Sequence, residues 1–283
     1  MVDQADTRSL PDELAALFPE GGDGRPLPPD LPPGELIWAD ESFARYRLST
    51  VRPALWLSRD PAGAGTWARY RALHPETGLW PLLLRPSDLQ GGEPWETGEL
   101  APEPVSRVDR HDARALMAEW WAESAAPSGG GHDVSEQLLP FGPDFPGLAP
   151  RAVPDRPPEE VADWLAGELT DGVARLGLVA ASRGADALAQ IGWMGPVNYS
   201  ERTAPLSAIL RSWEDRFGVR VVRLGFDTLD LSVAAPPKTP EHALAVAAEH
   251  WSFCPDSIDQ GVGNLGDYAR QIVGHHSWTF WWE

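Results

Sequence analysis

Proline and glycine divide this sequence between residues 125 and 158. Proline stands at 127, 140, 143, 146, 150, 154, 157 and 158, and three consecutive glycines stand at 129–131. Because proline has no backbone N–H, this stretch cannot form a regular ladder or a continuous helix. It is longer than an ordinary connection, which leaves two alternatives, an ordered arm or a boundary between domains. We favour the boundary, which divides the chain into residues 1–125, 126–157 and 158–283.

The first part, 1–125, alternates apolar runs with helical patterns and reads as an α/β region. We expect strands at 36–38, 46–51, 54–57 and 79–84, and helices at 11–18, 66–73 and from 109 or 111 to 124. The helix that begins at Thr66 should run to Leu73 and be ended by His74, Pro75 and Gly78, because a residue before proline disfavours helical geometry.

The last part, 158–283, reads as helices around an antiparallel hairpin. We expect strands at 176–181, 219–224, 229–233 and 278–282, and helices at 158–169, 185–192, 204–217, 240–251 and 267–273. Thr203 should cap the helix that Gly218 ends. Trp164, Trp213 and Trp251 occupy positions that we expect to face the core. The chain should therefore adopt an α+β fold, with a mixed or antiparallel sheet flanked by helices.

Charge excludes two classes of partner. The chain has 42 acidic and 23 basic residues, a formal net charge of −19, and the acidity is shared by both parts. A negative field repels phosphate backbones and anionic lipids, so we expect neither a nucleic acid nor a membrane partner. No apolar run is long enough for a membrane span, and residues 1–18 do not resemble a leader. We expect a cytoplasmic protein, and its oligomeric state stays open.

Several sequence blocks after Ala204 form a recognisable combination. They are Arg211–Gly218 (RSWEDRFG), Pro236-Pro237, Ala247–His250 (AAEH), Phe253–Asp256 (FCPD) and Trp278–Glu283 (WTFWWE). Together they resemble the bacterial family known as domain of unknown function 4253. Glu283 stands where that family more often has Asp. The resemblance implies a C-terminal domain in a bacterial cytoplasmic protein, and it brings no established activity, cofactor or catalytic residue.

One glycine motif could suggest a nucleotide site. Residues 261–266 (GVGNLG) match G-x-G-x-x-G and precede a predicted helix. A dinucleotide site needs a strand immediately before this loop, whereas Cys254 to Ser257 do not form a strand pattern. Lys238 is the single lysine and lies outside any phosphate-binding loop motif. We interpret 261–266 as a helix-entry loop and expect no cofactor.

Candidate chemistry gathers near the end of the predicted helix at 240–251. His250 and the single cysteine, Cys254, are four residues apart, a spacing that suits two zinc ligands or a nucleophile with its base. Glu249 and Asp256 could supply acid and base groups beside them. The structural alternative makes Cys254 a small buried side chain and His250 a cation at a helix C-terminus. The candidate catalytic residues are thus Glu249, His250, Cys254 and Asp256, with His250 and Cys254 as candidate metal ligands.

Tryptophan is the most unusual component, with 14 in the chain. Trp281 and Trp282 are adjacent on a predicted strand, so their rings should point to opposite faces of the sheet. The outer ring is either covered by the first part of the chain or offered to a partner. Trp120 and Trp121 form a similar pair on a helix. Trp281, Trp282 and Trp121 are therefore candidate partner-binding residues.

These features favour a binding protein over an enzyme. The charge, the tryptophans and the lack of a compact catalytic motif predict a protein-binding or regulatory module, of the immunity type, that is steered to a basic protein. The first alternative is a hydrolase or metal-binding enzyme that uses His250, Cys254 and nearby carboxylates. The second is a small-molecule binder with a cleft between the two parts of the chain.

Overall fold

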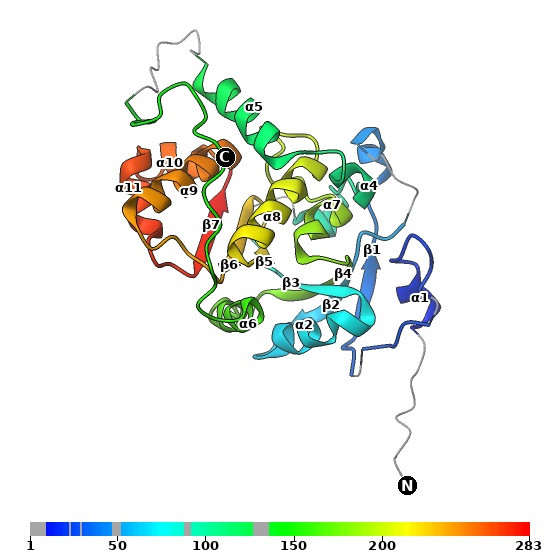
Figure 1. Ribbon diagram of the computed structural model, residues 1–283. Coiled ribbons are helices and arrows are strands. Elements are labelled where there is room, and N and C mark those ends of the chain that lie inside the picture. Colours follow the sequence, from blue (N-terminus) through cyan, green and yellow to red (C-terminus); the bar gives the residue numbers. More distant parts are fainter. Residues whose placement is uncertain (1–9, 23, 29, 47–51, 88–91, 127–135) are drawn as a thin grey trace.

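A single seven-stranded sheet organises the protein. The computed structural model describes residues 10–283 except 23, 29, 47–51, 88–91 and 127–135 (Figure 1). The strand order is β1-β2-β4-β3-β5-β6-β7, and every neighbouring pair is antiparallel except β3 and β5, which are parallel. Helices pack against this mixed sheet, which confirms the α+β fold.

The strands agree closely with the sequence patterns. They are β1 (Gly34–Ile37), β2 (Leu55–Pro61), β3 (Leu79–Leu84), β4 (Arg175–Ala180), β5 (Val219–Leu224), β6 (Thr228–Val233) and β7 (Ser277–Trp281). All six residues of β3 are buried, as its unbroken apolar run predicts. The expected strand at 46–51 lies outside the described residues apart from Tyr46, which ends a 3-10 helix, η1 (Glu41–Tyr46).

The helices vary widely in length. They are α1 (Asp12–Ala15), α2 (Thr66–Thr77), α3 (Pro94–Thr97), α4 (Val105–Val108), α5 (Ala113–Ala125), α6 (Pro158–Glu168), η2 (Gly184–Asp186), α7 (Ala187–Ile191), α8 (Ala204–Phe217), α9 (Pro240–Phe253), α10 (Asp256–Asp259) and α11 (Leu265–Ile272). None of the described helices is both long and apolar enough to cross a membrane.

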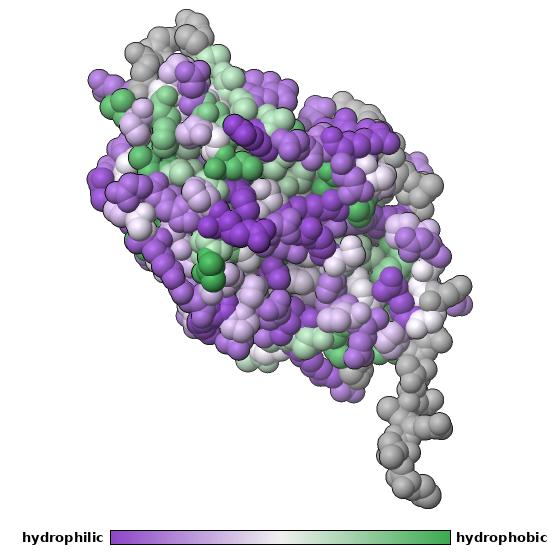
Figure 2. All heavy atoms as spheres, viewed as in Figure 1, coloured by the Kyte–Doolittle hydropathy of each residue, from purple (hydrophilic) through white to green (hydrophobic). Residues whose placement is uncertain are grey.

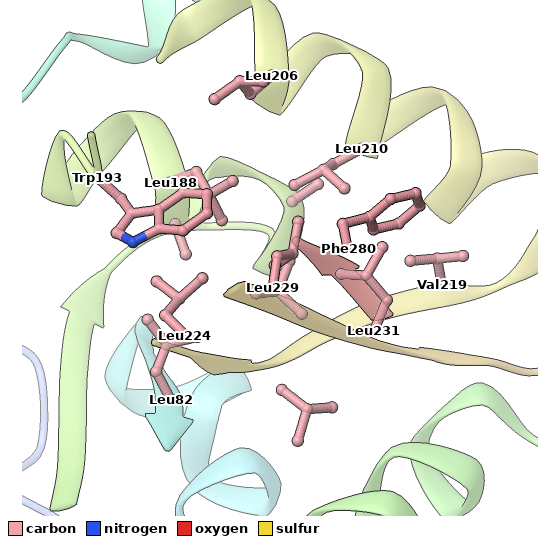
Figure 3. Close-up of a cluster of buried hydrophobic side chains, with 14 of the residues drawn as sticks. Leu82, Leu188, Trp193, Leu206, Leu210, Val219, Leu224, Leu229, Leu231 and Phe280 are labelled. Atoms are coloured by element: carbon pink, nitrogen blue, oxygen red, sulfur yellow. The ribbon is translucent and has the colours of Figure 1, made fainter. Parts of the chain in front are cut away.

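Helices cover both faces of the sheet. Helices α2 and α6 pack on one face, and α7 and α8 pack on the other (Figure 1). Figure 3 shows Leu206 and Leu210 of α8 directed toward the sheet, where Leu229 and Leu231 of β6 lie. Leu82 of β3 belongs to the same cluster, so the residues before and after 126–157 share one core.

Strands from both sides of residues 126–157 interleave in this sheet. Strand β4 pairs with β2 on one side and β3 on the other, and β3 also pairs with β5. The proposed division at 126–157 therefore does not separate two sheets. The boundary at 126–157 stays a prediction from the sequence.

The described end of the predicted linker, residues 136–157, packs as an arm against α8 and α9. The backbone N–H of Ala149 donates to Glu249 Oε1 at 2.6 Å, and that of Ala152 donates to the Arg216 carbonyl at 3.2 Å. His242 of α9 hydrogen-bonds the Pro150 carbonyl at 2.9 Å. These long-range contacts fix the path of a segment that has no regular structure.

Helix α2 passes through Pro75, so the predicted end at His74 and Pro75 is wrong. The Thr77 hydroxyl donates to the Leu73 carbonyl at 3.0 Å, and the N–H of Gly78 donates to the His74 carbonyl at 2.7 Å. These bonds complete the last turn, and Gly78 ends the helix with φ of 69°.

Two further expectations are wrong. Thr203 makes no side-chain cap on α8; the carboxylate of Glu103 instead accepts from the N–H groups of Thr203 and Ala204 at 2.8 and 3.2 Å. Trp164 does not face the core, because 44% of its surface is exposed. Trp213 and Trp251 are buried, as predicted.

Candidate functional site

The four predicted catalytic residues are close in sequence and buried in the structure. Glu249, His250 and Cys254 are 0% exposed and Asp256 is 5% exposed. Glu249 and His250 belong to the last turns of α9, Cys254 follows that helix, and Asp256 begins α10. Each side chain has its own set of partners, so the set does not converge on one reacting position.

Glu249 holds three elements together. Its carboxylate accepts from the Trp213 indole at 2.8 Å and from both terminal nitrogens of Arg216 at 2.5 and 2.7 Å. Its remaining partner is the N–H of Ala149 in the arm. Both oxygens are therefore committed to structural hydrogen bonds, which leaves Glu249 no free position as a base.

His250 lies among aromatic rings. Its ring centroid is 4.3 Å from that of Trp278, 4.9 Å from that of Phe280 and 5.2 Å from that of Trp213. Nδ1 hydrogen-bonds the Tyr268 hydroxyl at 3.0 Å. Burial, with a smaller contribution from the positive charge of Arg216, lowers the pKa of His250 to about 3. The side chain is therefore neutral at pH 7, and its interpretation as a helix-terminal cation is wrong.

Cys254 is a buried thiol. Its Sγ lies 2.9 Å from the Trp281 carbonyl and 3.1 Å from the Ser257 hydroxyl. Burial raises the pKa of Cys254 to about 12. Because the thiolate is both the nucleophile and the metal ligand, this environment disfavours both roles.

Asp256 secures the segments around it. Its Oδ1 accepts from the Tyr199 hydroxyl at 2.5 Å and from Gln260 Nε2 at 3.2 Å, and Oδ2 accepts from the N–H of Glu283 at 3.0 Å. Burial and the hydrogen bond to Asp256 raise the pKa of Tyr199. The carboxylate thus acts as an acceptor for three separate segments.

His250 and Cys254 do not assemble with further ligands. Within the part of the chain that the structure describes, no group of three or more His, Cys, Asp or Glu side chains is placed to hold a metal ion. The loop at 261–266 follows α10 and leads into α11, where Asn264 caps the helix by accepting from the N–H of Asp267 at 2.8 Å. A dinucleotide site requires a strand directly before such a loop, whereas this loop follows a helix.

The tryptophans proposed as partner anchors are mostly enclosed. Trp121 is 0% exposed and its ring centroid lies 4.8 Å from that of Trp251. Trp282 is 1% exposed and packs on Trp193 at 5.6 Å. Trp281 is half-buried, and its indole donates to Asp227 at 3.2 Å. Burial leaves Trp121 and Trp282 no surface to offer a partner.

Helix α6 instead exposes Trp164, which the sequence pattern predicted to face the core. Trp164 lies one turn from Glu160 and one turn from Glu168, and both glutamates are exposed. Among the described residues, neither glutamate has a cationic partner within ion-pair distance. Glu160, Trp164 and Glu168 form what we name the α6 surface.

A local signal in the sequence could have identified this surface. The buried residues of α6 are Val161, Ala162, Leu165 and Ala166, which occupy positions i, i+1, i+4 and i+5. At 100° per residue, this stripe places position 164 on the opposite side of the helix. The aromatic character of Trp164 suggested burial, whereas the positions of its smaller neighbours indicate exposure.

Comparison with known proteins gives one finding, and it concerns the end of the chain. No curated protein and no solved structure significantly matches this chain. A family model matches one region of the chain, residues 175–283. This region begins at β4 and contains β5 to β7 and α7 to α11, so it excludes α6 and everything before it. Residues 175–283 match the family described as Domain of unknown function (DUF4253), which confirms the resemblance read from the sequence.

Proposed function

We propose that this protein is a cytoplasmic protein-binding or regulatory module, of the immunity type, and that the α6 surface receives a basic protein partner. The observation that carries this proposal is the exposed ring of Trp164 between two carboxylates that lack a cationic partner among the described residues. Tryptophan is a common anchor of protein interfaces, and its face attracts arginine and lysine.

The surface around this helix supports a polar interface. Figure 2 shows mainly hydrophilic residues on the face that includes α6, while hydrophobic residues gather near α5 and α10. The net charge of −19 would steer a basic protein toward such a face and raise the association rate at low salt. Carboxylates beside an aromatic anchor favour a partner that presents arginine or lysine.

The environment of the predicted catalytic residues also favours binding over catalysis. Glu249 and Asp256 are engaged by structural donors, and Cys254 is held as a thiol. A hydrolase would need at least one of these groups free to reach a substrate. The binding proposal requires none of them.

Affinity capture from the native lysate tests the proposal. A tagged wild-type protein should retain a basic protein in stoichiometric amount, identified by mass spectrometry, and release it as salt rises. Trp164→Ala should lose this protein, and the double variant Glu160→Gln/Glu168→Gln should retain less of it.

Trp38→Ala is the matched control, because Trp38 is 47% exposed and lies outside α6. It should retain the partner as well as the wild type does. Recovery of the chain alone, or equal retention by Trp164→Ala, would refute the proposal. Circular dichroism of each variant verifies that the fold is intact.

A further inference from the structure

A cavity of about 480 Å³ lies where the first part of the chain meets the matched C-terminal region. Its described walls come from the residues after α1, Arg52 before β2, the end of α2, the start of α4, the end of β4 with the residues after it, and α7 (Figure 1). Cavities of roughly 300–1,000 Å³ hold metabolite-sized ligands. The cavity is therefore large enough for a small organic molecule.

Two arginines, Arg25 and Arg52, line this cavity. Arg52 donates to the carbonyls of Leu17, Pro53 and Gln190 at 3.3–3.4 Å and to the Gln190 side chain. Arg25 places its guanidinium carbon 4.6 Å from the ring centroid of Phe18. Within the described ranges, neither guanidinium has a carboxylate within ion-pair distance.

Other shielded arginines of this protein are neutralised. Arg71 lies 2.6 Å from Asp163, Arg216 lies 2.5 Å from Glu249, and Arg223 lies 2.7 Å from Asp230. A chain with 42 acidic residues offers many such partners. Among the described residues, these two cavity-lining arginines have no such partner, which departs from the pattern of the molecule. Burial lowers the pKa of Arg52 because it disfavours the charged guanidinium, and an anion beside Arg52 would stabilise that charged form.

The wall accommodates Arg25 closely. Gly78, also part of the lining, has φ of 69°, and a Cβ at this position would collide with the guanidinium of Arg25. Glycine at 78 therefore allows both the left-handed backbone that ends α2 and the close approach of the Arg25 guanidinium. The guanidinium thus lies close to Phe18 and Gly78, which both line the cavity.

Neutral polar groups complete the lining. His74 Nε2 donates to the Ala181 carbonyl at 2.7 Å, and burial lowers the pKa of His74. Ser182 and Gln190 add hydroxyl and amide groups. Glu20 is the one acidic residue among the described lining residues, and it is exposed.

We propose that this cavity binds a small organic anion, whose carboxylate or phosphate group accepts hydrogen bonds from the Arg25 guanidinium and is attracted by the positive charge of Arg52. Guanidinium groups match the geometry of oxyanions and bind them with charge-assisted hydrogen bonds. The remaining volume takes the body of the ligand between α2 and α4. This site is separate from the α6 surface, so either proposal can fail without the other.

Titration of the full chain with inorganic phosphate and with succinate tests the site. Isothermal calorimetry at constant ionic strength, with chloride as the reference salt, should detect saturable binding of at least one anion. The preferred anion identifies the group that the site recognises. Arg25→Gln and Arg52→Gln should each weaken binding by about tenfold or more.

Arg59→Gln is the control for removal of a positive charge, because Arg59 is exposed on β2 and does not line the cavity. It should bind as the wild type does. Lack of saturable binding of both anions overturns the proposal. An equal loss in Arg59→Gln also overturns it, because the effect would then reflect overall charge.

A second pair of variants keeps the test decisive if either arginine variant fails to fold. Ser182 lines the cavity from an exposed position, so Ser182→Glu adds a carboxylate with little effect on packing. It should weaken anion binding by about tenfold, while Ser182→Gln stays within about twofold of the wild type. Unchanged binding in Ser182→Glu overturns the proposal.

Discussion

His250 is an ionisable side chain kept in a place where its charged form is disfavoured. The surrounding rings of Trp213, Trp278, Phe280 and Tyr268 provide no carboxylate. The folded protein therefore binds a proton at His250 only near pH 3, whereas the unfolded chain binds it near the ordinary value of 6.5. His250 should contribute to acid sensitivity rather than to catalysis.

The sign of this effect follows from proton linkage. Between pH 6.5 and about 3 the unfolded state binds more protons than the folded state, so the free energy of unfolding falls as the pH falls. His250→Phe removes this contribution. Between pH 7 and 4.5 the variant should lose about 2–3 kcal/mol less stability than the wild type.

Urea unfolding at several pH values measures that difference. The exposed His275 provides the control, and His275→Gln should keep the wild-type dependence on pH. The comparison uses the slope with pH, so a change in absolute stability from loss of the Tyr268 hydrogen bond does not affect it. Equal slopes for His250→Phe and the wild type would show that His250 is not the responsible group.

Glu249 offers a second prediction for a single residue. Glu249→Gln leaves Arg216 charged and only 13% exposed without its counter-ion, and loss of one partner of a buried pair costs about 3–5 kcal/mol. Chemical denaturation should show a loss in this range. Glu241→Gln, at an exposed position on the same helix, should change stability by less than about 0.5 kcal/mol. A comparably small loss for Glu249→Gln would contradict the structural role.

At the scale of elements, helix α8 is capped from a distant segment. Glu103, 1% exposed, accepts from the N–H groups at the start of α8 and pairs with Arg202 at 3.2 Å. An anion at a helix N-terminus satisfies unpaired donors and interacts favourably with the helix dipole. Glu103 thereby joins the segment before α4 to a helix that lies 100 residues later.

Substitutions at the two ends of this contact should have unequal effects. Glu103→Ala should destabilise the protein by about 2–4 kcal/mol, because two backbone donors and Arg202 lose their acceptor. Thr203→Val should be close to neutral, because the Thr203 hydroxyl is buried without a partner among the described atoms. Thermal unfolding of the two variants measures both changes in stability. A larger loss of stability for Thr203→Val than for Glu103→Ala would indicate that Thr203 caps the helix.

At the scale of the whole molecule, the matched region depends on a strand that it does not contain. Strand β3, residues Leu79–Leu84, lies between β4 and β5 and pairs with both. Without it, β4 has no neighbour within residues 175–283, since its other partner is β2. The first part of the chain therefore completes the sheet of the second.

Truncation tests this dependence. A fragment of residues 158–283 should not form a stable native structure, because β4 and the edge of β5 would expose apolar side chains and unpaired backbone groups. Circular dichroism and the dispersion of amide resonances would measure whether the fragment is folded, with the full chain as the reference. A fragment with native dispersion and cooperative unfolding would instead support the boundary at 126–157.

Local patterns in the sequence determined most of the elements. The apolar run of β3, the hairpin of β5 and β6, and the alternating burial of Trp278 and Phe280 on β7 and of Trp282 directly after it each follow from neighbouring residues. Such patterns depend on a period of 2 or 3.6 residues, which the chain displays before it folds. Net charge is likewise a property of composition.

Tertiary structure alone decided which contacts join distant segments. Glu249 meets Ala149, and Glu103 meets Thr203, across 100 residues in each case. Arg25, which follows α1, and Arg52, which precedes β2, line one cavity together with residues of α2 and α7. A sequence pattern shows which residues share a face, but the partner of that face depends on long-range packing. The hydrogen-bond partners of Glu249 and Asp256 could therefore not be read from the sequence.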